Sequence, residues 1–206
     1  DGVFTTDPRI VPSARKMERV SHDEMLELAS LGAGVMHSRS IEFGKKFDVP
    51  IHVRNSASFS DEPGSIIGSL PESSDRAVSG CALTKNEARI SLTGVPDKPG
   101  IAYSILGPVA AANLDVDMIV QNIGASGHTD FSFTVNRGEY AKTLAVLEQA
   151  RGKNFTAREI IGDNRICKVS VVGIGMRSHV GIASRMFKAL AEEGINIQMI
   201  STSEIK

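Results

Sequence analysis

GVPDKPG at residues 94–100 decides the fold, because an altered copy of it, GIGMRSHVG, stands at residues 173–181. Each copy follows a strand-like run and precedes apolar residues spaced four apart, as one face of a helix requires. These apolar residues are Ile101, Ile105 and Val109 after the first copy, and Ile182, Met186 and Leu190 after the second. The offset of 81 residues, from Gly100 to Gly181, also aligns residues 114–119 with 195–200. The chain therefore contains one folding unit twice.

The first turn has the chemistry to hold a free amino acid. A strand that feeds a helix through a glycine-rich turn leaves helix N–H groups without partners, and with the helix dipole they suit a small carboxylate. Asp97 lies beside this place and can accept an ammonium group. On chemistry alone the second interpretation is favoured: Asp97 caps the helix, worth about 1 kcal/mol, with Pro99 in the first turn.

Outward from this turn the chain predicts one complete repeat in the order βαββαβ. The expected elements are strand 88–94, helix 99–112, strands 115–122 and 129–136, helix 138–151 and strand 154–161. This order favours an α+β, ferredoxin-like fold with an antiparallel four-stranded sheet and both helices on one face. Gly107-Pro108 predicts a kink or an early end in the first helix, because proline lacks the N–H.

The residues before the repeat predict the tail of an α/β domain. Ser21 and Glu24 have capping-box spacing and predict a helix over 21–31. A second helix is expected through 35–47 and a strand over 51–54. Residues 56–75 are rich in Ser, Gly and Pro and predict a linker, interrupted only by Ile66-Ile67. Further expectations are strands at 77–84, 167–172 and 198–206, with a turn at 85–87.

Composition excludes several classes of function. The net charge of -1 implies no basic surface, so nucleic acid is not an expected partner. No apolar run approaches the roughly 20 residues of a membrane span. Cys81 and Cys167 form no C-x-x-C pair, and the five histidines lack ligand spacing, so we expect no metal site. Reduced thiols and a cytoplasmic location are the default expectation.

Four separated stretches resemble one known family, the aspartate kinases. They are DGVFTTDPR at residues 1–9, ASLGA at 29–33 with SRSIE at 38–42, TGVPDKPG at 93–100 with Gln121-Asn122, and STSEI at 201–205. They cover nearly the whole chain in the family's order. The resemblance implies the end of an amino-acid-kinase domain followed by tandem ACT domains, which are small regulatory modules that bind amino acids.

The resemblance implies a parent enzyme that phosphorylates the side-chain carboxylate of aspartate with ATP and Mg²⁺, the first step toward lysine, threonine and methionine. It places no catalytic residue in this stretch, so this stretch alone is not expected to catalyse. The nucleotide-side residues that it implies are Phe4, Thr6, Asp7 and Arg9. The alternative is that Asp7-Pro8-Arg9 only shapes a corner. One departure is Gly34, which stands where the family usually has a lysine that helps to hold ATP phosphates.

For regulation, the resemblance implies feedback inhibition by lysine, threonine or both, bound where ACT domains pair. Asp97 would take the effector's ammonium group, and the backbone of Gly100, Ile101 and Ala102 its carboxylate. Other implied effector contacts are Gln121 from a strand, and Asn196, Ile197, Gln198, Ser201, Ser203 and Glu204 from the second copy. The pairing implies a homodimer through the ACT domains.

The expected domains are a kinase tail at 1–55, a linker at 56–76, a first ACT domain at 77–162 and a truncated second one at 163–206. The strand at 77–84 is the exception, because in the family's arrangement it can complete the second domain instead. Two alternative functions stay open, a non-catalytic ACT amino-acid sensor and a separate regulatory subunit of aspartate kinase. Since the chain starts without methionine, we expect it to be a piece of a longer protein.

Overall fold

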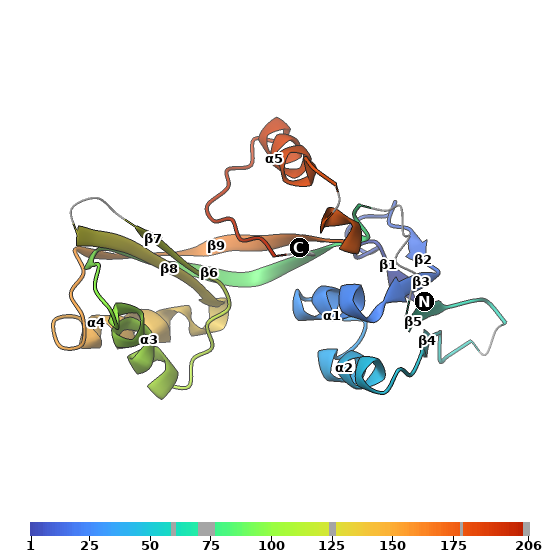
Figure 1. Ribbon diagram of the computed structural model, residues 1–206, viewed down its shortest axis with the longest axis horizontal. Helices are drawn as coiled ribbons and strands as arrows, with labels where there is room; N and C mark the ends of the chain where they lie inside the picture. The colour runs from blue at the N-terminus through green and yellow to red at the C-terminus, as the bar shows by residue number, and fades with distance from the viewer. Residues whose placement is uncertain (59–60, 70–76, 124–126, 178, 204–206) are drawn as a thin grey trace. The chain divides into compact units, whose positions relative to one another are not determined.

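The computed structural model describes residues 1–58, 61–69, 77–123, 127–177 and 179–203. The chain divides into two compact units, each drawn with its elements labelled in Figure 1. Unit 1 comprises residues 1–84 and 169–206, and unit 2 comprises residues 85–168. Two long strands, β6 (Gly80–Pro96) and β9 (Glu159–Val172), contribute to both units.

Unit 1 contains two small sheets with helices. Its elements are β1 (Val3–Phe4), β2 (Lys16–Met17), β3 (Arg19–Ser21), α1 (His22–Ser30), α2 (Ser38–Lys46), β4 (Ile51–Val53), β5 (Ser65–Gly68), the 3-10 helix η3 (Ile174–Arg177) and α5 (Ile182–Glu192). Strand β1 pairs antiparallel with β2. The second sheet has the order β3-β5-β4, with β3 and β5 parallel. Helix α1 begins with the predicted capping box, in which Ser21 and Glu24 bond each other's backbone N–H.

Strand β5 corrects the expectation of a linker over 56–75. Residues 65–68 form the central strand of the β3-β5-β4 sheet. Ser65 and Ile67 are fully buried, and the Ser65 Oγ–H bonds the carbonyl of Met17 at 2.6 Å. The Ser/Gly-rich composition hid this strand, because its stability comes from neighbours distant in sequence. The buried apolar residues of unit 1 are Val3, Met17, Val20, Met25, Leu28, Leu31, Ile41, Ile67, Ala82 and Val172.

Unit 2 has the predicted βαββαβ order and ferredoxin-like arrangement. Its sheet has the order β7-β8-β6-β9, with β7 (Ile119–Ile123) and β8 (His128–Asn136) paired antiparallel. Helices α3 (Ile101–Ala111) and α4 (Tyr140–Ala150) pack side by side on one face of the sheet (Figure 1). A short 3-10 helix, η2 (Arg137–Glu139), leads into α4. The even-numbered residues Ala88, Ile90 and Leu92 of β6 are buried in the core that the helices cover.

The length of β6 and β9 corrects two further expectations. The turn expected at 85–87 is absent, since β6 continues through these residues for 17 residues in all. The strands expected at 154–161 and 167–172 are parts of one 14-residue strand, β9. Cross-strand partners keep the polar residues extended: Glu87 pairs with Asn136 on β8, and Asn86 Nδ2 donates to Asn136 Oδ1 at 3.1 Å.

The internal repeat is confirmed in the backbone. Gly100 and Gly181, the residues before α3 and α5, both have φ of 87°, a left-handed conformation that favours glycine. The N–H of Ser104 bonds the carbonyl of Gly100 at 3.0 Å, and Arg185 bonds Gly181 at the same distance. Both helices span 11 residues and begin 81 positions apart. The two copies therefore have one turn geometry.

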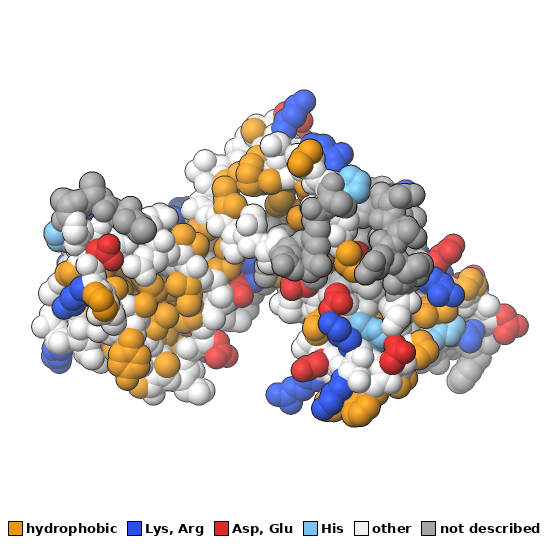
Figure 2. Space-filling model, in the orientation of Figure 1, with side chains coloured by type: hydrophobic (Ala, Val, Ile, Leu, Met, Phe, Trp, Pro, Cys, Tyr) orange, Lys and Arg blue, Asp and Glu red, His pale blue; other side chains and the backbone are white. Residues whose placement is uncertain are grey.

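The end of the second copy differs from the expectation. Residues 195–203 form no strand, although residues 198–206 were expected to be extended and paired. A strand requires a neighbour for its backbone hydrogen bonds, and in the described part of the chain no neighbour supplies them. Helix α5 buries only Ile182, and Figure 2 shows hydrophobic side chains on its surface.

Helix α3 does not end early at Pro108, as one reading of Gly107-Pro108 predicted. It continues to Ala111, and the N–H of Ala112 bonds the carbonyl of Pro108 at 3.1 Å. The missing proline N–H removes one helical bond, but Ile105 and Val109 on either side are fully buried. Burial of this apolar face outweighs the lost bond.

Candidate functional site

The first glycine turn presents an open helix N-terminus next to an exposed carboxylate. The N-terminal residue of α3 is preceded by Gly100, and no side chain caps the helix. This corrects the interpretation of Asp97 as a helix cap, because Asp97 lies three residues before Gly100. Its N–H bonds the carbonyl of Gly127 at 2.9 Å, whereas its exposed side chain has no hydrogen-bond partner among the described residues.

Burial distinguishes the residues that were predicted to bind the effector's carboxylate through their backbone. The Ile101 side chain is 4% exposed and belongs to the core, and its N–H bonds the carbonyl of Lys98 at 3.2 Å. Ala102 lies in the first turn of α3, ahead of the first helical bond from Ser104 to Gly100. The backbone of Ala102 therefore remains as a donor to an anion, while Ile101 contributes packing.

Gln121 lies on β7, at the edge of the four-stranded sheet. It pairs with Phe131 on β8, so its side chain leaves the sheet on the face that the helices cover. A hydrogen bond from Gly94 N to Asp130 Oδ1 at 3.0 Å holds β6 against β8 at this end of the sheet. A bulge shifts the β6-β8 register there. The edge strand and the glycine turn thus lie at one end of unit 2.

The contacts predicted from the second copy lie in unit 1. Asn196, Ile197 and Gln198 are in an irregular segment after α5, as are the exposed Ser201 and Ser203. Glu204 lies outside the described residues. The turn before α5 is ordered by η3, and the His179 ring bonds the carbonyl of Gly175 at 2.8 Å. The described residues of this set therefore lie in one irregular segment of unit 1.

The nucleotide-side stretch forms a corner held by an ion pair. Arg9 donates to both oxygens of Asp7, at 3.0 Å from Nε to Oδ1 and 2.8 Å from NH2 to Oδ2. These hydrogen bonds and the Asp7 charge raise the pKa of Arg9. The Arg9 side chain is 88% exposed, so its remaining N–H groups face solvent. Phe4 in β1 and Thr6 beyond it are half-buried. This arrangement shapes a corner on which the Arg9 guanidinium, paired with Asp7, is exposed to solvent.

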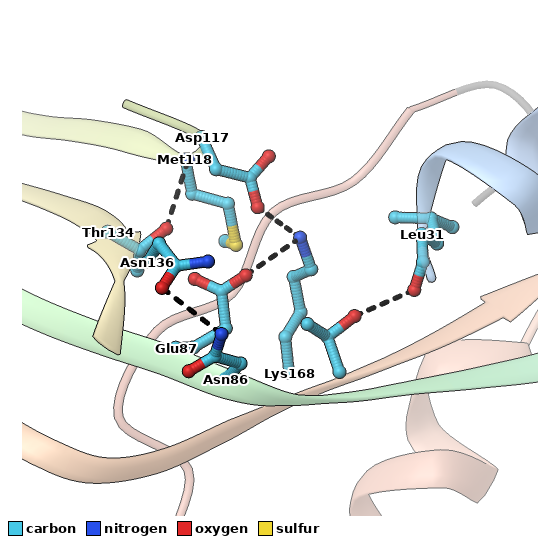
Figure 3. Close-up of polar contacts among 9 residues, drawn as sticks. Leu31, Asn86, Glu87, Asp117, Met118, Thr134, Asn136 and Lys168 are labelled. Carbon is cyan, nitrogen blue, oxygen red and sulfur yellow. Dashed lines mark hydrogen bonds and ion pairs between the residues drawn. The ribbon is translucent and has the colours of Figure 1, made fainter. Parts of the chain in front are cut away.

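A charged cluster that the sequence did not indicate joins three segments of unit 2 (Figure 3). Lys168 of β9 pairs with Glu87 of β6 at 3.5 Å and with Asp117, which precedes β7. Burial raises the pKa of Glu87, and Lys168 opposes this effect only in part. Glu87 Oε2 is buried and has no hydrogen-bond partner among the described residues. The cluster fixes the entry to the edge strand that carries Gln121.

Two negative findings concern the described residues. No group of three or more His, Cys, Asp or Glu side chains in them is arranged to hold a metal ion. None of their helices has the length and apolar character to cross a membrane. Burial raises the pKa of Cys81, the half-buried cysteine of β6.

Comparison with protein families matches the two ends of the chain. Residues 1–55 match the amino acid kinase family, and residues 169–206 match the ACT domain. The first match covers the corner at Asp7 and the helices α1 and α2. The second covers the last part of β9, the second glycine turn and α5.

Known relatives match the chain over its whole length. Aspartate kinase from Pseudomonas putida is 54% identical over 208 residues, which is all of this chain and 50% of that protein. A crystal structure of aspartokinase alpha and beta subunits is 62% identical, with a TM-score of 0.57, covering 62% of this chain and 83% of the other. Aspartate kinase from Clostridium acetobutylicum has a TM-score of 0.87 at 28% identity, covering 99% of this chain and 47% of that one. The chain spans about half the length of the curated relatives that it matches.

Proposed function

Because the chain belongs to the aspartate kinase family, we propose that the whole protein transfers phosphate from ATP to the side chain of aspartate, and that residues 77–206 regulate it. The observation that carries this proposal is the match of all of this chain to half of an aspartate kinase at 54% identity. ATP would bind with Mg²⁺ on the side of Phe4, Thr6, Asp7 and Arg9. Aspartate-dependent ATP turnover by the whole protein tests the activity, and its absence would contradict it.

The regulatory ligand that we propose is lysine, threonine or both. An α-amino acid carries an ammonium and a carboxylate on one carbon, so a site for it needs an acceptor and a donor close together. Asp97 offers an exposed carboxylate, and the first turn of α3 offers backbone N–H groups. Gln121 on the edge strand would add a polar contact from the neighbouring part of the sheet. The second copy would supply the remaining contacts from Asn196, Ile197, Gln198, Ser201, Ser203 and Glu204.

Calorimetric titration of the whole protein with lysine and with threonine tests this site. We expect Asp97→Asn to raise the Kd of the effector by about tenfold or more, because a hydrogen bond to a charged group is lost. Stability should change little, since the Asp97 side chain is exposed. Asp115→Asn, another exposed carboxylate of unit 2, is the control and should leave the Kd unchanged. Equal affinity of the Asp97→Asn variant and the wild type would remove Asp97 from the site.

We also propose the domain organisation of a kinase tail and two ACT domains, with residues 77–84 completing the second ACT domain. Two observations support the last point. Ser79 N bonds the carbonyl of Val172 at 2.8 Å, and residues 77–84 cluster with residues 169–206 rather than with 85–168.

Pairing of ACT domains in a homodimer would cover the apolar side of α5. Light scattering that shows a monomer at micromolar concentration would contradict the dimer.

A regulatory subunit without its own catalysis is the second candidate. It is favoured by the match to the aspartokinase alpha and beta subunits, of which the chain covers 83% of one subunit at 62% identity. The ATP turnover assay separates the two candidates. Effector binding without aspartate-dependent turnover would establish the subunit, and turnover would exclude it.

A further inference from the structure

Glu24 is a buried carboxylate that accepts hydrogen bonds from three separate segments of unit 1. Its side chain belongs to α1, and the residue is 4% exposed. Oε2 accepts from the N–H of Ser21 at 3.3 Å and from its hydroxyl at 2.9 Å. Oε1 accepts from the hydroxyl of Ser79 and from the N–H of Ile174 at 3.2 Å. One carboxylate thus joins the start of α1, the residue before β6 and the first residue of η3.

This arrangement exceeds what a helix cap requires. A capping box needs only the bonds between Ser21 and Glu24. The other oxygen bonds partners 55 and 150 positions away in the sequence. No cationic side chain in the described ranges forms an ion pair with Glu24, so its charge depends on these donors. A buried charge without such donors is costly, and bonds to an ionised acceptor are stronger than neutral ones.

Backbone contacts link the junction, meaning the three segments that Glu24 joins, to the corner that carries Asp7 and Arg9. Cys81 N donates to the carbonyl of Thr5 at 2.7 Å, two residues beyond Ser79. At the other end of the junction, Gly173 lies against residues 77–79, where a Cβ atom would come within 2.4 Å of the Ala77 carbonyl oxygen. Because of this close approach, Gly173 cannot move toward residues 77–79 unless the residues before β6 move as well. Val172, Ala82 and Val3 share one buried core.

We propose that Glu24 is a positioning residue that couples the second glycine turn to the nucleotide-side corner. It holds Ile174, the first residue of η3, on the start of α1 and on Ser79, and Ser79 leads through β6 to Thr5. An effector that changes the conformation of residues 173–177 moves Ile174. The bond at Glu24 then transmits this movement to the corner that carries Asp7 and Arg9. The inference rests on the proposed regulation by an amino acid.

Glu24→Gln tests the coupling, because glutamine has one acceptor oxygen. That oxygen can serve Ser21 N or Ile174 N but not both, so one backbone N–H loses its partner. Ser21→Ala is the matched variant, since it weakens the cap of α1 and leaves Oε1 with Ser79 and Ile174. Glu42→Gln, an exposed position on α2, controls for the charge. Amide hydrogen exchange is measured on the whole protein without effector, and kinase activity is measured with saturating lysine and with saturating threonine.

The expected results differ between the variants. In Glu24→Gln, exchange should accelerate by about tenfold or more at the segment whose N–H loses its partner, either the start of α1 or residues 172–177. Inhibition at saturating effector should weaken by roughly fivefold or more when residues 172–177 are the segment that loosens, and should be retained when they stay protected. Ser21→Ala should loosen the start of α1 and retain both the protection of 172–177 and the inhibition. Glu42→Gln should match the wild type throughout.

Four results would overturn the coupling. Weakened inhibition in Glu24→Gln without faster exchange at 172–177, or unchanged exchange at both segments, would show that the bond from Glu24 does not hold the turn. Faster exchange at 172–177 with full inhibition would show that the turn does not act through Glu24. Equal loss of inhibition in Ser21→Ala would reduce Glu24 to a cap. A wild-type protein that neither effector inhibits overturns the proposed regulation itself, and the inference with it.

Discussion

Gly34 is the residue whose substitution is most informative about the nucleotide side. It stands in a turn between α1 and α2, it is exposed, and no atom lies within 4 Å of the position that its Cβ would occupy. Its φ is not in the left-handed region, so the backbone accepts a side chain. A lysine therefore fits there without rearrangement.

We expect Gly34→Lys to lower the KM for ATP by about threefold to tenfold, because an ammonium near phosphates adds a charge-assisted bond. Steady-state kinetics with varied ATP measure this effect, and kcat should change less than KM. Gly34→Gln supplies similar length without the charge and serves as the control. If lysine and glutamine have the same effect, Gly34 is not near the phosphates.

Glu87 should make stability depend on pH. Its native pKa is raised by burial above the value of the unfolded chain, about 4.3. The contribution of Glu87 to stability is therefore complete below that value and is lost as the pH rises through the native pKa. Relative to the wild type, Glu87→Gln should become progressively more stable as the pH increases over this range.

Urea unfolding of both proteins between pH 4 and pH 7 at constant ionic strength measures the difference. The exposed Glu159→Gln variant is the control and should show no such trend. A difference between Glu87→Gln and the wild type that does not vary with pH would mean that Lys168 fully compensates the burial of Glu87.

Among the elements, α3 and α5 show what the repeated glycine contributes. Gly100 and Gly181 share φ of 87°, and no atom lies within 4 Å of a Cβ built at either position. Any cost of substitution is thus a backbone cost and not a steric clash. We expect Gly100→Ala to destabilise unit 2 by about 1 kcal/mol, and Gly100→Asn by less, since asparagine tolerates this conformation better.

Chemical denaturation measures both values. An alanine variant as stable as the wild type would indicate that the turn changes conformation instead. The same substitutions are also useful for function, because they alter the turn without removing the Asp97 carboxylate.

The elements that the sequence predicted well are those with local signals. Ser21 and Glu24 are three residues apart, and their capping box placed the start of α1 correctly. The periodic apolar residues after Gly100 and Gly181 located both helices. Residues 65–68 and 85–87 were missed for the opposite reason. Ile67 is buried by partners in β3 and β4, and Glu87 is held by Asn136 and Lys168, all of them distant in sequence.

The candidate site shows the same limit. The position of Asp97 in an exposed turn followed from the glycines around it. The burial of Ile101 and the extra partners of Glu24 did not, because both depend on which segments pack together. Family resemblance supplied the chemistry of the site, and the structure corrected the role of Asp97 as a helix cap.

At the scale of the whole molecule, the two units have separate cores. All buried apolar residues of the unit 2 core lie between Ala88 and Phe155, and those of unit 1 lie outside this range. We expect residues 85–168, produced alone, to fold and to unfold cooperatively in urea with native near-ultraviolet signals. The polypeptide that lacks Lys168 and Glu87, residues 88–167, is the matched comparison and should be less stable. A molten, non-cooperative 85–168 fragment would contradict an independent core.

Strands β6 and β9 leave unit 1 as neighbours, since Ser79 bonds Val172 on one side of the division and Arg158 N bonds the carbonyl of Thr93 on the other. In genetic terms, the proposed domain organisation makes residues 85–168 an insertion, and its two junctions would lie on neighbouring strands. A deletion that joins Thr84 to Val169 through an Asn-Gly turn would close a hairpin rather than leave a gap. With this geometry, one copy of a duplicated segment can be inserted into the middle of the other copy while the two strands at the insertion point, β6 and β9, stay paired.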